Sequence, residues 1–244
     1  DLDLGTSYFT NKSVTSEIAA RLPYTFILAL GSMILSCVIG IPLGITAAVN
    51  QNKLSDRISM LIALIGVSMP QFWIGLLLVL IFSVHLGLLP PSGVGTWKHY
   101  IIPIIATSLN GIATQARLVR SSMLEVIRSD YVTTARAKGV SKFSAVYKHA
   151  LPNALIPVIT QVGTSFGKTL GGTIVIESVF SIPGIGNYMI SAVNNRDYPV
   201  VRGSVVFLAV TFSFIVLLVD IIYAYVDPRI KAQYEGKSRR KKNG

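Results

Sequence analysis

Five long runs almost free of charged residues constrain this chain more than any other feature. The runs cover residues 25–49, 58–84, 100–116, 154–176 and 203–226, and only Lys168 and Asp220 interrupt them. A helix of about 20 apolar residues crosses a ~30 Å hydrocarbon core. Backbone groups in lipid must bond within the segment, and the runs lack the alternation of barrel strands. They therefore predict an all-α polytopic membrane protein with five visible spans, the third reaching about residue 120.

The composition agrees with this class and excludes others. Only 14% of the 244 residues are charged and mean hydropathy is +0.59, whereas soluble domains carry about a quarter charged residues. The net charge of +11 would also suit a nucleic-acid binder. The basic residues lie between apolar spans, however, so we expect no nucleic-acid partner. A single cysteine, Cys37, and three histidines in separate loops predict neither a disulfide nor a metal site.

The basic residues also predict an orientation. Sixteen Lys and Arg residues fall in one set of connections and only five in the other. Basic loops face the cytoplasm, so residues 117–153 and the basic tail, 227–244, should be cytoplasmic. Five spans then leave residues 1–24 outside. No signal-peptide pattern precedes the first span, so we expect a further helix upstream of Asp1, making six.

Helix breakers and one charge lie inside the predicted spans. Pro70 removes a helical hydrogen bond and should kink its helix, which would open a cavity or a hinge. The alternative is that Pro70 only shapes the packing of the helices. Lys168 should lie roughly 21 Å into its helix. A charge at that depth is costly, so Lys168 either lines a pathway and meets a substrate carboxylate or pairs with an acidic residue. The pathway residues expected on this basis are Met69, Pro70, Gln71, Lys168, Gly171 and Gly172.

A soluble-looking basic segment, residues 121–153, separates the third and fourth spans. Residues 121–138 predict a helix that continues the third span and ends at Gly139. Ser141 then caps a second helix, whose apolar face includes Phe143 and Tyr147 and which Pro152 ends. Such a helix could lie in the lipid interface, form a solvated loop or dock on another protein.

The end of this segment resembles the cytoplasmic motif of permease subunits of binding-protein-dependent ABC importers. That motif is Glu-Ala-Ala, three residues, Gly, nine residues, then Ile-x-Leu-Pro. The corresponding positions here are Thr133, Thr134, Ala135, Gly139, His149, Leu151 and Pro152. Thr133, Thr134 and His149 depart from the general motif. The longer string DYVTTARAKG, at residues 130–139, resembles the variant of the dipeptide, oligopeptide and nickel branch.

Other segments are similar to the same branch, in the same order. They are RLPYT at residues 21–25, ARLVRSSMLE at 116–125, IPGIG at 182–186, RDYPV at 196–200 and DPR at 227–229. The resemblance spans about residues 20–230. It implies a type I ABC importer permease fold, with six spans in the whole chain and a cytoplasmic coupling helix.

The resemblance also implies partners. Members of the family pair with a second, related permease, two ATP-hydrolysing subunits and an extracytoplasmic substrate-binding protein. The chain has no phosphate-binding Gly-x-x-x-x-Gly-Lys-Ser/Thr loop. We therefore expect no catalytic residue or cofactor here, with ATP and Mg²⁺ on the partner ATPases. The residues implied in ATPase coupling are Thr133, Thr134, Ala135, Arg136, Lys138, Gly139, Lys142, Phe143, Val146, Tyr147, His149, Leu151 and Pro152.

The segment at residues 177–202 should lie at the external mouth. We expect it to gate the pathway or contact the binding protein; the alternative is an ordinary ordered loop. The residues concerned are Glu177, Pro183, Gly184, Gly186, Arg196, Asp197 and Tyr198.

The expected function is that of an importer permease in the plasma membrane of a bacterium or archaeon. It would carry short peptides or nickel chelates by alternating access. A secondary transporter or channel would have similar hydropathy, but no inverted repeat with paired broken helices is evident. An intramembrane enzyme is not supported, because neither a Ser–His–Asp arrangement nor a His-Glu-x-x-His motif is present.

Overall fold

The computed structural model describes residues 3–226, which form helices and connecting loops. Extended pairing among these residues is limited to one isolated bridge between Thr6 and Ser13. The elements are α1 (Val14–Val49), α2 (Leu54–Ser68), α3 (Gln71–Leu78), π-helix η1 (Val79–His85), 3-10 helix η2 (Trp97–Tyr100), α4 (Ile101–Ile127), α5 (Asp130–Ala137), α6 (Lys142–Ser144), π-helix η3 (Ala145–Ala150), α7 (Leu151–Ala154), α8 (Ile156–Gly172), α9 (Ile174–Val179), α10 (Ile185–Asn194) and α11 (Tyr198–Val226). The predicted basic tail lies outside the described residues.

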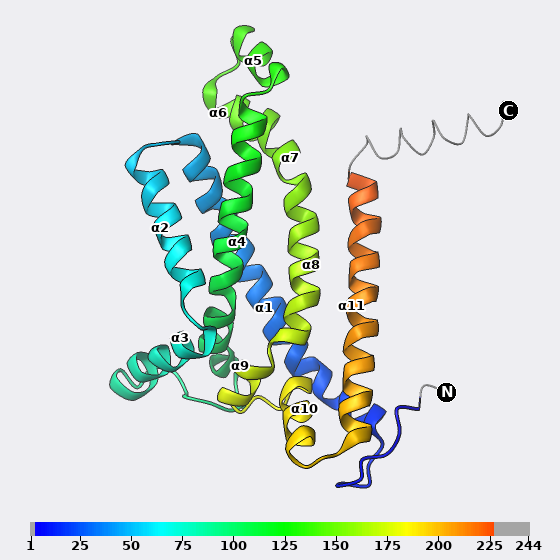
Figure 1. The fold of residues 1–244 in the computed structure, drawn as a ribbon. Helices are drawn as coiled ribbons and strands as arrows, with labels where there is room; N and C mark the ends of the chain where they lie inside the picture. The colour runs from blue at the N-terminus through cyan, green and yellow to red at the C-terminus, as the bar shows by residue number, and fades with distance from the viewer. Residues whose placement is uncertain (1–2, 227–244) are drawn as a thin grey trace, which may run out of the picture.

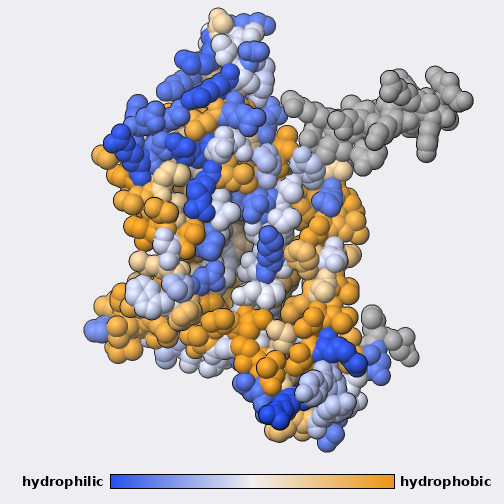
Figure 2. All heavy atoms as spheres, in the orientation of Figure 1, coloured by the Kyte–Doolittle hydropathy of each residue, from blue (hydrophilic) through white to orange (hydrophobic). Residues whose placement is uncertain are grey.

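The long helices form one bundle (Figure 1). Helices α1, α2, α4, α8 and α11 run roughly along one direction, and α5 and α6 project beyond them at one end. Helices α3, α9 and α10 lie at the other end. We refer to these as the α5 end and the α10 end. Orange, hydrophobic side chains cover α2, α3 and α11, with a paler, partly blue strip between them (Figure 2).

Helices α1 and α4 form the central pair of the bundle, and small residues allow them to approach closely. A Cβ at Gly44 would lie 2.7 Å from the carbonyl oxygen of Ala116 and 2.6 Å from the Cβ of Val119. The Ser36 hydroxyl of α1 donates to the Ser108 carbonyl of α4 at 3.0 Å. Small residues and interhelical hydrogen bonds are the usual means of joining helices in lipid.

Two of the long helices begin earlier than their uncharged runs predict. Helix α1 begins at Val14 rather than near residue 25, so the external segment before it is shorter than predicted. Charged Glu17 and Arg21 pair with each other on its first turns, while Val14 and Ile18 are buried against α10 and α11. Helix α11 likewise begins at Tyr198 instead of residue 203. A charge-based boundary fails wherever a helix extends past the hydrocarbon.

The second uncharged run is not the single span predicted over residues 58–84. Helix α2 ends at Ser68 and α3 begins at Gln71, with a bend of 99° between them. Met69 and Pro70 have extended backbone, because proline lacks the N–H that would continue the helix and disfavours helical geometry in the residue before it. The run therefore turns sideways and ends in a π-helix.

Length and composition support two to three membrane spans within residues 3–226. Helices α1 and α11 qualify individually, and α2 with α3 and η1 forms a third if the bent pair is one span. Helix α8 has 17 residues and stops at Gly172 rather than at residue 176, while α4 carries Arg117 and Arg120 in its second half. Both lie within the bundle beside α1 (Figure 1). The five predicted spans fall on α1, α2 with α3 and η1, α4, α8 and α11, and a membrane crossing by α4 and by α8 stays a prediction.

We expect Gly44→Val to destabilise the bundle, because the added side chain would collide with the backbone of α4. Overpacking of this kind costs about 1–3 kcal/mol. The matched control is Gly171→Ala, since a Cβ at Gly171 meets no atom within 4 Å. Thermal unfolding of the purified proteins in detergent measures both. Equal melting temperatures for Gly44→Val and the wild type would contradict the close-packed contact.

Candidate functional site

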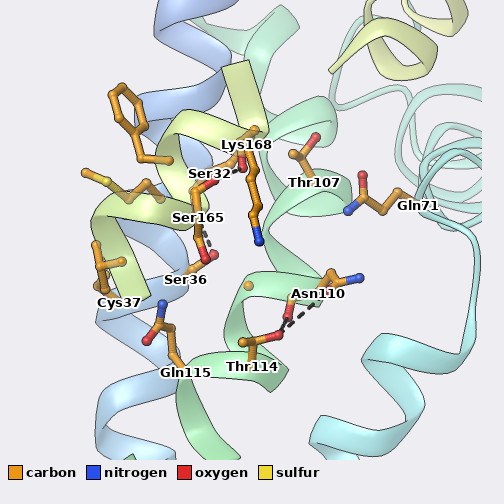
Figure 3. Close-up of a pocket in the computed structure, with 15 residues that line it drawn as sticks. Ser32, Ser36, Cys37, Gln71, Thr107, Asn110, Thr114, Gln115, Ser165 and Lys168 are labelled. Carbon is orange, nitrogen blue, oxygen red and sulfur yellow. Dashed lines mark hydrogen bonds between the residues drawn. The ribbon is translucent and has the colours of Figure 1, made fainter. Parts of the chain in front are cut away.

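A polar cavity of about 200 Å³ lies inside the bundle, between α1, α3, α4 and α8. Figure 3 shows its labelled side chains converging from these helices. Its lining residues are Ser32, Met33, Ser36, Cys37, Gln71, Thr107, Asn110, Gly111, Thr114, Gln115, Val162, Ser165, Phe166, Lys168 and Thr169. None of them is acidic, and Lys168 is the one cation among them.

Lys168 extends from α8 into this cavity, and its ammonium group points toward Asn110 and Thr114 (Figure 3). Within residues 3–226 it forms no hydrogen bond or ion pair. The side chain is therefore placed as the pathway prediction requires, and the alternative of an acidic partner is not met inside the described part of this chain.

The remaining predicted pathway residues lie mainly in an adjoining pocket of about 460 Å³, which includes Met69, Pro70 and Gly172. Gln71 and Asn110 line both spaces, so the two pockets are adjacent. Gly171 is exposed and lines neither. The structure thus brings five of the six predicted pathway residues to two adjacent pockets, although their role in transport remains a prediction.

Sequence reasoning missed the polar face of α4. Thr107, Asn110, Gly111, Thr114 and Gln115 all line the cavity at intervals of three and four residues, which is the spacing of one helix face. A search for polar periodicity within the uncharged run would have found them. On α1, Ser32 and Ser36 repeat the same spacing.

The basic segment forms a compact projection at the α5 end, residues 129–152, which we call the knob. Two predictions about it hold: Gly139 has a positive φ of 90° after α5, and the Ser141 side chain accepts a hydrogen bond from the Ser144 N–H. The predicted continuous helix over residues 121–138 is wrong, since α4 ends at Ile127 and Ser129 is extended. Ser129 occupies the N-cap position of α5, which serine favours over a helix interior, although its hydroxyl donates to the Val126 carbonyl and makes no capping bond.

Pro152 does not end the second helix of the knob, contrary to prediction. Leu151 keeps helical dihedrals, and Pro152 lies in the first turn of α7. Proline is tolerated there because the first N–H groups of a helix have no intrahelical acceptor. The helical path therefore continues through α7 toward α8, so the knob is joined to α8 without a long loop.

The predicted apolar face of the knob is divided in the structure. Val146 and Ala150 are buried and, with Val132 of α5, pack against Val119 and Met123 of α4. These contacts attach the knob to the bundle. A π-helix has more residues per turn than an α-helix, so the i, i+3, i+4 spacing does not keep the whole predicted face on one side. That face consisted of Phe143, Val146, Tyr147, Ala150 and Leu151.

Phe143 and Tyr147 form the outward part of that face. They are 72% and 42% exposed, and their ring centroids lie 4.4 Å apart. The other outward-facing knob residues that we predicted to couple to an ATPase are Thr133, Thr134, Arg136, Lys138, Lys142, His149 and Pro152, whereas Ala135 and Leu151 are partly buried.

Tyr131 holds the two halves of the knob together. Its hydroxyl donates to the His149 carbonyl at 3.4 Å and accepts from the Asn153 amide at 2.6 Å. Tyr131 was not among the predicted site residues. Together with the buried Val132 contacts, this bridge makes α5 and η3 one unit.

An ion pair near the same end was also missed. Asp56, at the start of α2, is 3% exposed and accepts two hydrogen bonds from Arg120 of α4, at 2.7 and 2.8 Å. The Asn52 N–H donates to the same carboxylate at 2.9 Å. This two-pronged geometry specifies distance and orientation, so it ties the α1–α2 hairpin to the helix that supports the knob.

At the α10 end, Glu177 is fully buried at the centre of a hydrogen-bond network. Its carboxylate accepts from the hydroxyls of Thr25, at 2.8 Å, and Thr173, at 2.9 Å, and from the Asn187 N–H, at 3.0 Å. Gly184 packs directly on the carboxylate, where a Cβ would collide with it. The network joins α1, α9 and α10, so the predicted external loop is an ordered helical cap.

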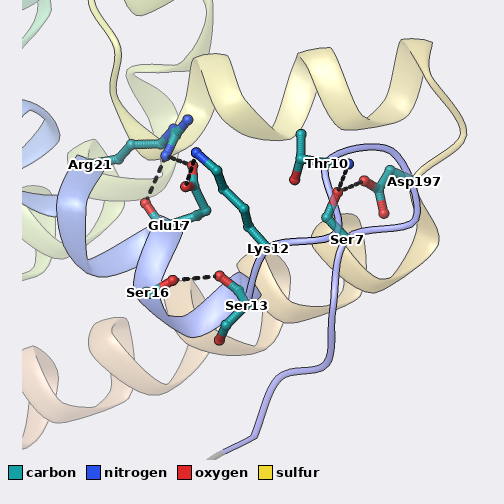
Figure 4. Close-up of polar contacts among 8 residues, drawn as sticks. All are labelled: Ser7, Thr10, Lys12, Ser13, Ser16, Glu17, Arg21 and Asp197. Atoms are coloured by element: carbon teal, nitrogen blue, oxygen red, sulfur yellow. Dashed lines mark hydrogen bonds and ion pairs between the residues drawn. The ribbon is translucent and has the colours of Figure 1, made fainter.

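Asp197 anchors the N-terminal loop to this cap (Figure 4). It accepts hydrogen bonds from the Ser7 hydroxyl and from the Tyr8 and Phe9 N–H groups. Burial alone would raise the pKa of Asp197, but hydrogen bonds from Ser7 and three backbone N–H groups outweigh it, so the pKa lies below its usual value.

The other predicted gate residues differ in exposure. Arg196 and Tyr198 are exposed, Gly186 is buried against α9, and Pro183 and Gly184 line a pocket of about 290 Å³ beside Asp197. The structure thus brings all seven predicted residues to one end of the bundle, where a gating or docking role stays a prediction.

A helical membrane bundle around a polar cavity, with an exposed knob at one end, defines a transmembrane transport subunit. The chain belongs to the family described as the binding-protein-dependent transport system inner membrane component, which matches residues 40–232. It is therefore a permease subunit of an ABC importer, not an enzyme; partner ATPases hydrolyse ATP, and a substrate-binding protein is a further partner.

Curated relatives are similar over most of their length. The chain is 46% identical to the glutathione transport system permease protein GsiC of Pectobacterium atrosepticum, over 94% of this chain and 75% of the relative. It is 44% identical, with the same coverage, to the protein of that name from Escherichia coli K12.

Solved structures confirm the predicted type I permease fold. An inward-facing structure of the MetNI methionine ABC transporter matches with a TM-score of 0.74 at 20% identity, covering 87% of this chain and 97% of that one. A crystal structure of an amino acid ABC transporter with histidines matches with a TM-score of 0.64 at 15% identity, covering 88% and 94%.

The depressed pKa of Asp197 predicts a pH-dependent contribution to stability. A carboxyl with a lowered pKa stabilises the fold above its unfolded value of about 3.9, and this stabilisation is lost as pH falls through the folded value. At pH 7 we expect Asp197→Asn to lose about 1–3 kcal/mol, the cost of hydrogen bonds to a charged group. The gap between the two melting temperatures should shrink as the pH falls below about 4.

The exposed carboxylate of Asp130 provides the control. Asp130→Asn should melt close to the wild type at pH 7. A gap between Asp197→Asn and the wild type that stays unchanged down to pH 3 would contradict the role of the ionised carboxylate.

Proposed function

We propose that this chain forms half of the translocation pathway for a peptide-like solute such as glutathione, and that its knob transmits the motion of a partner ATPase. The complex would contain a second, related permease and two ATPases. In this proposal the knob and the C-terminus face the cytoplasm, as the distribution of Lys and Arg favours. The α10 end then faces the external binding protein. ATP and Mg²⁺ would bind only to the ATPases.

The observation that carries the coupling proposal is the division of the knob into a packed side and an exposed aromatic side. Val132, Val146 and Ala150 fix it to α4, so a push on the knob moves the bundle. Phe143 and Tyr147 remain uncovered among exposed basic residues. A solvated loop would not need the packed side. A short helix presenting rigid aromatic side chains suits a groove on a partner protein.

The cargo proposal rests on the relatives and on the cavity. The proteins named as glutathione permeases share 44–46% of residues with this chain over nearly its whole described length. The cavity offers hydroxyl and amide groups, which suit peptide bonds and the polar ends of a peptide. A free nickel ion would need carboxylate, imidazole or thiolate ligands, and within residues 3–226 no cluster of His, Cys, Asp or Glu suited to a metal ion occurs. A nickel chelate brings its own ligands, so the ATPase experiment below distinguishes it.

We expect Gly139→Pro to abolish coupling while the chain still inserts in the membrane. Proline fixes φ near −65°, whereas Gly139 has a φ of 90° and its N–H donates to the Arg136 carbonyl. The turn of the knob would be lost, and with it co-purification of the ATPase and uptake of the cargo.

The matched control is Gly87→Pro. Gly87 also has a positive φ and open space around it, but it lies in the loop that follows η1. Gly87→Pro should still bring down the ATPase. Unchanged uptake by Gly139→Pro, at equal membrane levels, would refute the coupling role.

The cargo is tested by measuring the ATPase activity of the complete complex in liposomes. The binding protein is added on the side to which the α10 end faces. We expect glutathione to stimulate hydrolysis more than a dipeptide, a longer peptide or a nickel chelate. The reason is that a chain 44–46% identical to the named glutathione permeases should belong to a complex that accepts a similar solute. Stronger stimulation by the nickel chelate would contradict the proposed cargo while leaving the importer class intact.

A further inference from the structure

We propose that Lys168, with amide groups of α4, forms a binding site for a carboxylate of the transported solute, so that the permease itself selects anionic peptides. This inference rests on the proposed function and adds a specificity-determining site to it. The site lies at the centre of the bundle and not at either end.

The first argument is electrostatic. Lys168 extends into the cavity and has no counter-ion within residues 3–226, and no acidic residue lines the space. An unpaired ammonium group inside a membrane protein is costly, and such charges usually face a pathway or a partner charge. A carboxylate on the solute would supply the missing partner and form a charge-assisted hydrogen bond.

The second argument is the state of the amide groups in the cavity wall. Gln115 is 2% exposed, and its Oε1 atom is buried without a hydrogen-bond partner. Buried polar groups rarely stay unpaired. Asn110 and Gln115 lie about one and a half helical turns apart on α4, and both line the cavity. They provide donors and acceptors for a peptide bond or for an α-amino group.

The third argument is that most hydroxyls of the wall already donate a hydrogen bond within the protein. Ser36 donates to the Ser32 and Ser108 carbonyls, and Thr107 donates to the Pro103 carbonyl. Their oxygen atoms can still accept hydrogen bonds, but they offer no proton to an anion. Lys168, the side-chain amides and the Ser165 hydroxyl, which only accepts from the Gln161 amide, are therefore the donors left for a carboxylate.

The size of the cavity limits what it holds. About 200 Å³ is smaller than the ~300–1,000 Å³ of sites that enclose a whole drug-sized ligand. The cavity therefore encloses one end of a small peptide. The class of solute favoured is one with at least one free carboxylate and neighbouring amide groups, whereas esterified peptides and hydrated metal cations are disfavoured.

The test measures uptake and ATPase activity separately in the reconstituted complex with its binding protein. The variants are Lys168→Met, which keeps length and removes charge, and Lys168→Arg, which keeps charge. Lys53→Met is the control, because Lys53 is exposed in the loop between α1 and α2 and does not line the cavity. The cargoes are glutathione and its diethyl ester, each at a concentration that saturates the binding protein.

We expect Lys168→Met to lower glutathione uptake by about 10- to 100-fold, the value of a hydrogen bond to a charged group. Stimulation of the ATPase by the loaded binding protein should stay within about twofold of the wild type. Lys168→Arg should restore most of the glutathione uptake. Uptake of the diethyl ester should be the same in the wild type and in Lys168→Met, because the ester has no free carboxylate.

Two outcomes would overturn the inference alone. Equal glutathione uptake by the wild type and Lys168→Met would show that the solute does not meet Lys168. A parallel loss of complex yield, ATPase activity and uptake of both cargoes would show that Lys168 pairs with an acidic residue of the second permease. Failure of the wild-type complex to import any peptide would instead overturn the proposed function, and the inference with it.

Discussion

The close approach of α1 and α4 is the contact on which the rest of the structure depends. Gly44 lets the two backbones meet, and the Ser36 hydroxyl bonds across them. Helix α4 then presents one polar face to the cavity and, further along, packs against the knob through Met123. Helix α1 carries Thr25, which bonds Glu177 at the opposite end. One pair of helices thus connects the knob, the cavity and the α10 end.

Much of this arrangement could be predicted from local chemistry. Uncharged runs identify the long helices, and the special backbone of Gly139 and the capping role of Ser141 follow from rules that act within a few residues. The errors arose where two local rules compete. Ser129 is tolerated inside a helix, but its hydroxyl bonds the Val126 carbonyl of the preceding turn where α4 ends. Pro152 excludes a helix interior but suits a first turn, and only the position of α7 decides between these possibilities.

Contacts between distant residues were not predictable from one sequence. Asp56 and Arg120 lie 64 positions apart, and Thr25 and Glu177 lie 152 apart. Each residue alone looks like an ordinary loop charge or helix hydroxyl, because burial is set by the packing of other helices. The polar face of α4 is different. Its spacing was present in the sequence, but a search based on charge does not detect uncharged polar residues within an apolar run.

The bend at Pro70 has a consequence for how a solute passes through the protein. It places Gln71, with Asn110 of α4, in the walls of two adjacent pockets. An amide can donate and accept at once and carries no net charge. On the proposed pathway, a polar solute that meets these two amides can therefore exchange one set of hydrogen bonds for another.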